Sequence, residues 1–436
     1  MKGGGERNKE KRTHIMQYII NAPEKINHTV ALPASKSISN RALAINYLSD
    51  SDTYPENLSK CDDTDVMVDA LGSMPYEINI KAAGTAMRFT TAILSVTEGE
   101  HVITGTERMR HRPIGVLVDA LRKLGADIEY VEAEGFPPLR VRGRKLRGGR
   151  LDIPGNVSSQ FISAILMIGP MMTTGLTLHM TGHVMSKPYI DLTICTMREY
   201  GSDVDWTNGS TIRVEPRAYA PTSFVIENDW SAASYWYEIV SLLGKKYPKA
   251  DLKAVMPGLM DGSRQGDSAV RYIFRMLGVK TEFSDKSKQL VPTDVTLSPQ
   301  HRGLPRLDFD FSGQPDLAQT IVVTTALLNV PFRFTGLETL RIKETDRIAA
   351  LKAEMRKLGF VLDDSVEGTL SWNGERCEPM AEPAIDTYED HRMAMAFAPA
   401  AIMFPGLRIN NPMVVTKSYP EFWNELRAAG FDITEA

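Results

Sequence analysis

Cysteine, long apolar runs and an excess of positive charge are all lacking in this sequence. The three cysteines, Cys61, Cys195 and Cys377, form no C-x-x-C pair, which argues against a disulfide framework or a zinc site and favours a cytosolic location. The apolar stretches at 161–172 and 394–404 are interrupted by Ser, Gly or Pro and are too short to span a membrane. Lys and Arg total 50 against 54 Asp and Glu, and the resulting net charge of −4 excludes a nucleic-acid coat protein.

A secretory signal is also missing from the N-terminal segment. The first fourteen residues, MKGGGERNKEKRTH, are charged and glycine-rich and lead into no apolar region, so we expect a loose extension there. The composition is otherwise that of an ordinary globular protein, with 43% hydrophobic and 24% charged residues. At about 150 residues per domain, the 436 residues predict two or three domains.

One supersecondary unit recurs along the chain. Five segments end an amphipathic helical pattern at a glycine and continue as a strand pattern, and these glycines are Gly125, Gly201, Gly278, Gly359 and Gly430. They follow one another at intervals of 76, 77, 81 and 71 residues, and glycine is the usual residue just after a helix. A sixth helix over 62–72 is predicted to end at Gly72, only 53 residues before Gly125. The first repeat is therefore predicted to be shortened.

Six α/β units can be arranged in two ways. Each unit follows the order strand, helix, strand, helix and short strands, which predicts an α/β fold. One long α/β array remains an alternative on the repeat alone. Six units also divide evenly into two lobes of three, and the motifs described next favour that arrangement.

Several predicted helices begin with small or polar residues beside cations. Backbone N–H groups at a helix start are unpaired and partly positive, so they suit phosphate or carboxylate groups. Any one of these starts is more often a plain helix cap, and we hypothesise that they converge on one cleft. The segments are PASKSISNRA with Lys36, Ser37 and Arg41, AAGTAMR with Gly84 and Thr85, RHRPIG with Arg112 ahead of Pro113 as the first helical residue, and GNVSSQ with Ser158, Ser159 and Gln160.

The second half of the chain supplies titratable groups ahead of helices. Asp316 precedes an apolar helical run, and Lys417 precedes the last helix. LRIKETDRIAAL concentrates Lys343, Glu344, Asp346 and Arg347, and TYEDHRMAMAF holds Asp390, His391 and Arg392. For KETDR two interpretations stay open: a proton donor with a phosphate-binding lysine, or a capping cluster in which Thr345 caps the helix and Asp346 favours its dipole.

Nine motifs stand in the order found in the EPSP synthase family, and together they span nearly the whole chain. They are P-x-S-K-S-x-S-N-R-A, A-G-T-A-M-R, R-P-I, V-S-S-Q, S-K-P-Y, P-D, K-E-T-D-R, D-H-R-M-A-M and T-K. The chain therefore resembles this family, which implies two similar lobes of three βαβαββ units each, as an inside-out α/β barrel. The expected domains are 35–235 for the first lobe and 14–34 plus 236–436 for the second.

The resemblance implies an enzyme that transfers the enolpyruvyl group of phosphoenolpyruvate to the 5-hydroxyl of shikimate 3-phosphate and releases phosphate. This reaction belongs to chorismate and aromatic amino acid biosynthesis and uses neither a metal nor an organic cofactor. The expected partners are these two small molecules alone, with no nucleic acid or membrane, and we expect a cytoplasmic monomer. Both substrates are polyanions, which agrees with the many cationic helix starts.

The resemblance also implies residue roles. Asp316 is the expected base at the attacking hydroxyl, Glu344 the acid at the methylene carbon, and Lys36 and Lys417 stabilise the leaving phosphate. Shikimate 3-phosphate is expected at Lys36, Ser37, Arg41, Ser158, Ser159, Gln160, Ser186, Tyr189, Asp316, Thr339 and Lys343. Phosphoenolpyruvate is expected at Lys36, Gly84, Arg112, Gln160, Arg347, Arg392 and Lys417.

Three positions depart from the family pattern. Ala82 stands where Asn is usual, Phe89 replaces the Pro after the Arg of A-G-T-A-M-R, and Thr339 replaces an Asn. Two other functions stay open as alternatives. A non-catalytic or weakly active metabolite-binding paralogue is one, although Asp316, Glu344 and Lys417 argue against it. An enolpyruvyl transferase for a UDP-amino sugar is the other, but that enzyme uses a Cys acid that no motif here supplies.

Overall fold

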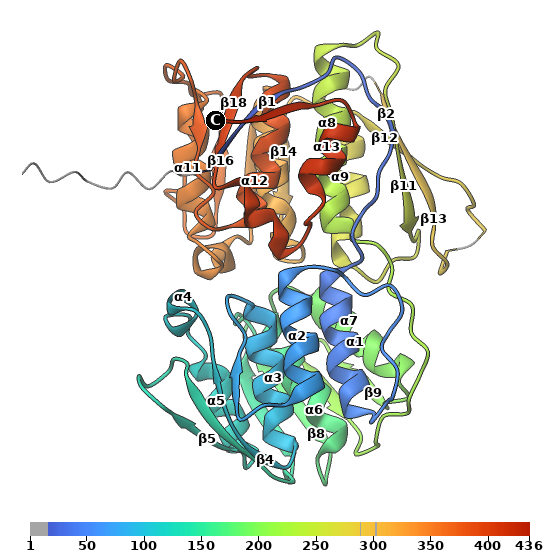
Figure 1. Cartoon of the computed structure of the whole chain (residues 1–436), viewed down its shortest axis with the longest axis vertical. Helices are drawn as coiled ribbons and strands as arrows, with labels where there is room; N and C mark the ends of the chain where they lie inside the picture. Colours follow the sequence, from blue (N-terminus) through green and yellow to red (C-terminus); the bar gives the residue numbers. More distant parts are fainter. Residues whose placement is uncertain (1–15, 288, 301–302) are drawn as a thin grey trace, which may run out of the picture.

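The computed structural model describes residues 16–287, 289–300 and 303–436. Figure 1 shows two α/β bodies, one above the other, which we call the lower lobe and the upper lobe. The lower lobe holds α1 to α7, and the upper lobe holds α8 to α13 together with the N-terminal strands β1 and β2. The predicted extension over the first fourteen residues lies outside the described residues.

Each lobe has its own hydrophobic core. One cluster of buried side chains runs from Leu43 to Tyr219 and fills the lower lobe. A second cluster joins Ile20 and its neighbours to side chains between Trp230 and Ile433 and fills the upper lobe. Two separate cores are what a two-lobe α/β fold requires, because each layer of helices and sheets buries its own apolar face.

One sheet pattern recurs in both lobes. In order across the sheet, two parallel strands joined through a helix are followed by two antiparallel strands. The lower sheets are β3 (Glu77–Asn79), β4 (Gly99–Thr104), β6 (Leu139–Gly143), β5 (Asp127–Tyr130), and β7 (Gly149–Pro154), β8 (Leu176–Thr181), β10 (Thr211–Val214), β9 (Val204–Asn208).

The upper lobe repeats the pattern with two strands, β1 and β2, from the N-terminal end of the chain, although one of its sheets has three strands. Here β1 takes the place beside β18 that β6 takes beside β4, and β2 lies parallel to β11. The upper sheets are β2 (Asn27–Thr29), β11 (Lys253–Leu259), β13 (Thr293–Pro299), β12 (Val279–Phe283); β14 (Leu307–Asp310), β15 (Phe332–Thr335), β16 (Leu370–Trp372); and β17 (Ala384–Ile385), β18 (Leu407–Asn410), β1 (Gln17–Asn21), β19 (Asp432–Glu435).

Helices alternate with these strands, and the helix after the first strand of a unit is the most buried. Every residue of α10 is buried, including Gln319 and three threonines, so this helix is enclosed by the upper core. The lower helices are α1 (Lys36–Leu48), α2 (Asp62–Ser73), α3 (Gly84–Val96), α4 (Glu107–Arg110), α5 (Gly115–Lys123), α6 (Ser159–Ile168), η1 (Gly169–Met171) and α7 (Lys187–Glu199). The upper helices are α8 (Trp230–Lys246), η2 (Gly266–Ala269), α9 (Val270–Met276), η3 (Pro315–Leu317), α10 (Ala318–Leu327), η4 (Glu338–Ile342), α11 (Arg347–Lys357), α12 (His391–Phe397), η5 (Ala398–Ile402), η6 (Pro412–Lys417) and α13 (Phe422–Ala428).

The repeat glycines terminate helices as predicted. Gly125, Gly201, Gly278, Gly359 and Gly430 all have φ between 82° and 102°, a conformation that costs other residues energy. The sixth position is different: α2 continues to Ser73, and Met74 takes the left-handed conformation with φ 38°. The prediction that this helix ends at Gly72 is therefore wrong by one residue.

The first unit is shortened. Between β2 and β3 the described chain forms α1 and α2, and its strand-like contacts are isolated bridges, Ala34 with Asn228 and Glu56 with Val225. The other units have sheets of three or four strands. The first unit of the lower lobe thus consists of its two helices, and its sheet is reduced to isolated bridges.

Two chain segments cross side by side between the lobes. The Ser35 N–H donates to the Glu227 carbonyl at 2.9 Å, and the Asp229 N–H donates to the Pro33 carbonyl at 2.9 Å. The predicted domain limits, 35–235 and 14–34 plus 236–436, stay a prediction. Because α8 packs as a whole into the upper core, we propose that the second limit lies at these crossing residues, just before Trp230.

Of the helices within the described ranges, none has the length and apolar character needed to cross a membrane.

The crossing contains a buried carboxyl group whose titration is testable. Glu227 is 4% exposed, and burial raises its pKa to about 7 despite hydrogen bonds from Ser263 and Gln265. The folded state therefore prefers protonated Glu227, and stability is lost as the pH rises from about 4.5 towards 7. For Glu227→Gln we expect the unfolding free energy, relative to the unmodified protein, to rise by about 1–3 kcal/mol between pH 5 and pH 8.

Chemical denaturation at the two pH values measures this difference. Glu56→Gln, which removes an exposed carboxylate near the same crossing, is the control and should change little with pH. A difference between the Glu227 variant and the unmodified protein that is the same at both pH values would contradict the prediction.

Candidate active site

Both lobes line one cavity, and nearly all the predicted site residues meet there. The lower lobe contributes Lys36, Ser37, Arg41, Gly84, Arg112, Ser158, Ser159, Gln160, Ser186 and Tyr189, and the upper lobe contributes Asp316, Thr339, Lys343, Glu344, Arg347 and Arg392. Lys417 does not line the cavity, but its ammonium group lies 3.1 Å from the Glu344 carboxylate. The predicted convergence of helix starts on one cleft is present in the structure.

The cavity also includes residues absent from the predicted set: Asp63, Thr85, Arg88, Pro113, Phe161, Ile342 and His391. Arg88 and His391 stand inside the A-G-T-A-M-R and D-H-R-M-A-M motifs, so the motifs themselves carried a signal for them. Asp63, Phe161 and Ile342 belong to no motif for an anionic ligand. Their place in the cavity depends on how the helices pack.

Three lower-lobe helices direct their N-termini at the cavity. Ser35 caps α1, which leaves the Ser37 hydroxyl free of a capping role, and Ser158 caps α6. The start of α3 at Gly84 has no side-chain cap. A Cβ on Gly84 would lie 2.6 Å from Arg112 Nη1, so only glycine lets this guanidinium approach the helix start.

The start of α5 differs from the prediction. This helix begins at Gly115 behind Ile114, so Pro113 is not its first helical residue as predicted. Ile114 has φ −133° and ψ −1°, outside the helical range, and its N–H donates to Gly135 instead. Arg112 therefore enters the cavity from the turn that follows α4.

Two buried arginines in the lower lobe form no ion pair with a carboxylate of residues 16–287, 289–300 or 303–436. Arg41 donates to Thr193 Oγ1 at 2.7 Å, to Ser163 Oγ at 3.2 Å and to two carbonyls, and its guanidinium lies 5.6 Å from the Phe89 ring centroid. Arg88 donates to the Gly84 carbonyl and lies 5.8 Å from the Phe161 ring. Burial lowers the pKa of Arg41 to about 10 and that of Arg88, beside Arg112, to about 9.

An aromatic ring supports a guanidinium without neutralising it, whereas a carboxylate would cancel its charge. The positive charge of Arg41 and Arg88 is therefore available to an anion in the cavity. Phe89, one of the departures from the family pattern, is fully buried and provides this support.

The upper lobe contributes carboxylates held by cations. Arg347, only 1% exposed, donates to Asp390 at 2.7 and 3.3 Å, to Asp316 at 3.1 Å and to Glu344 at 2.9 Å. Asp346 caps α11 through the N–H groups of Ile348 and Ala349. The interpretation of Thr345 as the cap is therefore wrong, and Lys343 and Glu344 face the cavity.

Both predicted acid–base carboxylates are ionised in this arrangement. Burial raises the pKa of Asp316, but Arg392, Lys343 and Arg347 outweigh it and hold the pKa well below its usual range. Burial likewise raises the pKa of Glu344, and Lys417, Arg347 and Arg112 lower it well below the usual range. Asp316 is thus ionised, as a base must be, whereas ionised Glu344 has no proton to donate.

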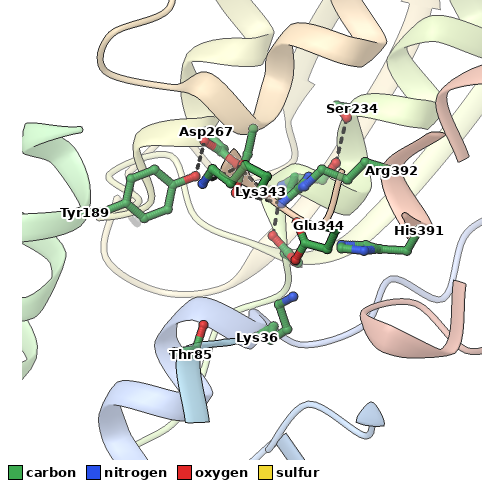
Figure 2. A network of polar contacts seen from close by, with 12 residues as sticks. Lys36, Thr85, Tyr189, Ser234, Asp267, Lys343, Glu344, His391 and Arg392 are labelled. Carbon is green, nitrogen blue, oxygen red and sulfur yellow. Dashed lines mark hydrogen bonds and ion pairs between the residues drawn. The ribbon is translucent and has the colours of Figure 1, made fainter. Parts of the chain in front are cut away.

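His391 and Lys36 complete the charged surroundings of Glu344. Figure 2 shows the His391 ring beside Glu344 and Lys36 reaching towards them from the lower lobe. His391 is 1% exposed, and neither ring nitrogen has a hydrogen-bond partner in the part of the chain that the structure describes. Burial together with Lys36 and Arg392 holds its pKa well below the usual range. Lys36 pairs with Asp63 at 3.1 Å.

Hydrogen bonds cross the cavity between the lobes. Figure 2 shows Tyr189 reaching Asp267, to which its hydroxyl donates at 3.0 Å. Ser186, at the start of α7 with φ 53°, donates its N–H to the Ser312 carbonyl at 2.7 Å. Lys417 donates to the Ala82 carbonyl at 3.3 Å. Ala82, one of the departures from the family pattern, therefore contacts Lys417 through its backbone. Buried Thr339 Oγ1 has no hydrogen-bond partner among the described residues.

Fold and cavity together define a class of protein. Two α/β lobes enclose helix N-termini and unpaired guanidinium groups that suit polyanionic small molecules, and paired carboxylates stand beside them for proton transfer. This arrangement is that of a two-lobed transferase with polyanionic substrates.

The comparisons with known proteins specify the family. The family model for EPSP synthase (3-phosphoshikimate 1-carboxyvinyltransferase) matches residues 20–80 and 73–426. A 3-phosphoshikimate 1-carboxyvinyltransferase of Bacteroides fragilis is 56% identical over 96% of this chain and 99% of its own length, and that of Aliivibrio fischeri is 34% identical over 92% and 97%. The chain belongs to the EPSP synthase family, and the family and reaction predicted from the sequence are confirmed.

Solved structures agree on the fold. An EPSP synthase from Acinetobacter baumannii has a TM-score of 0.76 at 20% identity and covers 96% of this chain and 100% of its own. The enolpyruvyl transferase NikO from Streptomyces tendae has a TM-score of 0.71 at 17% identity, with 97% and 99% covered. The predicted two-lobe α/β fold is confirmed.

The carboxylate cluster around Arg347 predicts a large loss of stability. Arg347→Met removes the shared cation and leaves Asp390, which is fully buried, without its bidentate partner. We expect a loss of about 3–5 kcal/mol at pH 7. The loss should shrink as the pH falls below about 4, because Asp316 and Glu344, whose pKa values Arg347 helps to lower, no longer gain from the cation once they are protonated.

Denaturant unfolding measures this loss. Arg341→Met is the matched control, since Arg341 pairs with Asp346 and Asp364 at 39% exposure and should contribute less than about 1 kcal/mol. Equal losses in the two variants would show that the buried cluster does not stabilise the upper lobe.

Proposed function

We propose that this chain is a 3-phosphoshikimate 1-carboxyvinyltransferase that transfers the enolpyruvyl group of phosphoenolpyruvate to the 5-hydroxyl of shikimate 3-phosphate and releases phosphate. The observation that carries the proposal is a single cavity in which Arg41, Arg88 and Arg112 form no ion pair with a carboxylate among the described residues, although Glu344 is close enough to interact with Arg88 and Arg112. Buried cations without a direct counter-ion are costly unless the cavity receives anions. Family membership identifies those anions.

The proposal assigns the substrates to different parts of the cavity. Shikimate 3-phosphate lies mainly against the lower lobe, and phosphoenolpyruvate lies between Gly84 and the upper-lobe cations. The first set is Ser37, Arg41, Ser158, Ser159, Gln160, Ser186, Tyr189, Asp316, Thr339 and Lys343, the second is Gly84, Arg112, Gln160, Arg347, Arg392 and Lys417, and Lys36 contacts both.

Ionised Asp316 suits the role of base. It accepts the proton of the 5-hydroxyl as that oxygen attacks C2 of phosphoenolpyruvate, and a proton passes to the methylene carbon, which becomes a methyl group. The tetrahedral intermediate then loses phosphate and one methyl proton to give the enol ether. Lys36 and Lys417 stabilise the charge on the departing phosphate.

Glu344 becomes an acid only after substrate binds. In the free protein Lys417 and Arg347 keep it ionised. When the phosphate and carboxylate of phosphoenolpyruvate engage these cations, the cations stabilise the Glu344 carboxylate less and its pKa rises. Binding and protonation of Glu344 are thus coupled, which supplies the proton at the stage when the reaction needs it.

The wider proposal describes a cytoplasmic monomer with the two small molecules as its partners, no metal or organic cofactor, and lobes that meet at the paired crossing. Steady-state phosphate release with both substrates tests the function. Turnover that requires shikimate 3-phosphate supports it. Absence of turnover in folded protein that still binds shikimate 3-phosphate would identify a metabolite-binding paralogue, and turnover only with a UDP-amino sugar would identify the other transferase.

Asp316→Asn and Glu344→Gln keep shape but lose the transferable proton. We expect kcat to fall at least about a hundredfold in each variant while substrate affinity changes little. Asp364→Asn is the control, because Asp364 pairs with Arg341 and Lys352 outside the cavity and should leave kcat unchanged. Near-normal kcat in well-folded Glu344→Gln would end the assignment of Glu344.

Arg41→Met and Arg392→Met separate the two substrates. Methionine keeps much of the side-chain volume and removes the charge-assisted contact, so each variant should lose about 10- to 100-fold in affinity for one substrate. Titration should show weaker shikimate 3-phosphate binding for the Arg41 variant and weaker phosphoenolpyruvate binding for the Arg392 variant. Equal losses for both substrates in both variants would contradict the assignment.

A further inference from the structure

The turn before α12 has an unusual backbone. Tyr388 and Glu389 both have left-handed φ angles, 54° and 55°, although neither is glycine. Two consecutive residues of this kind persist only where surrounding contacts hold them. They directly precede Asp390, which caps α12 and binds Arg347, and Arg392, which donates to Asp316 at 3.0 Å. The conformation of this turn therefore sets the position of the cluster around Asp316.

Contacts from two directions hold the turn. From the upper lobe, buried Glu354 accepts a hydrogen bond from the Tyr388 hydroxyl at 2.6 Å. From the lower lobe, Arg108 Nη1 lies 2.6 Å from Glu389 Oε2 and 3.2 Å from the Tyr388 carbonyl. Arg108 belongs to α4, which Figure 1 shows at the border of the lower lobe facing the upper lobe. One guanidinium thus binds both residues of the turn across the gap.

We propose that Arg108 is a positioning residue: by clamping the 388–389 turn, it couples closure of the lobes to the placement of Arg392. We call the Arg108–Glu389 pair the interlobe clamp. The proposal rests on the proposed function, since its kinetic consequence is a higher kcat/KM for phosphoenolpyruvate when the clamp is intact. Arg108 itself touches neither substrate and acts through Glu389 and the turn.

The exposure of the clamp fits a contact that breaks in every cycle. The Arg108 and Glu389 side chains are 39% and 69% exposed, so the pair is weak and is screened by salt. A strong buried pair would hold the lobes shut and slow product release. A weak pair shifts the balance towards the closed state by a small factor only.

The same short helix offers a matched control. Arg110 pairs with Glu132 at 3.1 Å, with 37% and 53% exposure, so its surroundings resemble those of the clamp. Both of these residues belong to the lower lobe. Loss of this pair changes the surface charge by the same amount without affecting any contact between the lobes.

Charge reversal and its repair test the clamp. In Arg108→Glu we expect kcat/KM for phosphoenolpyruvate to fall about two- to fivefold at low salt, the range that exposed pairs support, with kcat nearly unchanged. The double variant Arg108→Glu with Glu389→Arg should recover most of the loss, and all differences should fade at about 1 M salt. Arg110→Glu should have no effect on kcat/KM. No loss in Arg108→Glu, or a loss that the double variant leaves unrepaired, overturns the proposal.

A measurement without substrate separates this proposal from the proposed function. Small-angle X-ray scattering of the free protein should give a larger radius of gyration for Arg108→Glu than for the unmodified protein, and the double variant should restore the smaller value. The same radius in all three overturns the clamp. Normal phosphate release with unchanged radii would leave the function standing without the clamp, whereas repaired radii without any turnover would support the clamp and refute the function.

Discussion

Arg347 makes the contact on which the rest of the site depends. Its guanidinium joins Asp316, Glu344 and Asp390, which come from three different segments of the upper lobe. One buried cation among three carboxylates fixes their separations, and together with Arg392, Lys343 and Lys417 it keeps Asp316 and Glu344 ionised. Because Asp390 also caps α12, the same contact orients the helix that carries His391 and Arg392. The contacts of Arg347 therefore both stabilise the upper lobe and position the residues of the site.

The two lobes carry complementary kinds of charge. The lower lobe presents helix N-termini and guanidinium groups supported by aromatic rings, whereas the upper lobe presents carboxylates and cations that already neutralise one another. A polyanion therefore gains most from the lower lobe, and its arrival redistributes the cations around Glu344. Contacts across the gap, at Tyr189, Lys417 and Arg108, bring the two sets together.

Local patterns in the sequence were enough for most of the residues that line the cavity and for the period of the fold. Capping glycines such as Gly125 are readable because a left-handed residue after a helix is a local requirement. Motifs such as S-K-S-x-S-N-R place Lys36 and Arg41 at one helix start, and the structure puts both in the cavity. The helix boundaries were predicted less accurately: α2 ends one residue after the predicted Gly72, and α5 starts at Gly115 rather than at Pro113.

Only the tertiary structure decided which groups pair. The capping interpretation named Thr345 as the cap of α11, whereas Asp346 is the cap in the structure, and nothing local shows that Phe89 supports Arg41 or that Arg108 reaches Glu389. These partners are far apart in the chain and meet through helix packing and lobe contact, which no short pattern encodes. The sequence determined that this protein binds anions between two α/β lobes. The packing determined which cations pair with carboxylates, as Arg347 and Arg392 do, and which contact only neutral groups, as Arg41 does, because these partners come from distant segments of the chain.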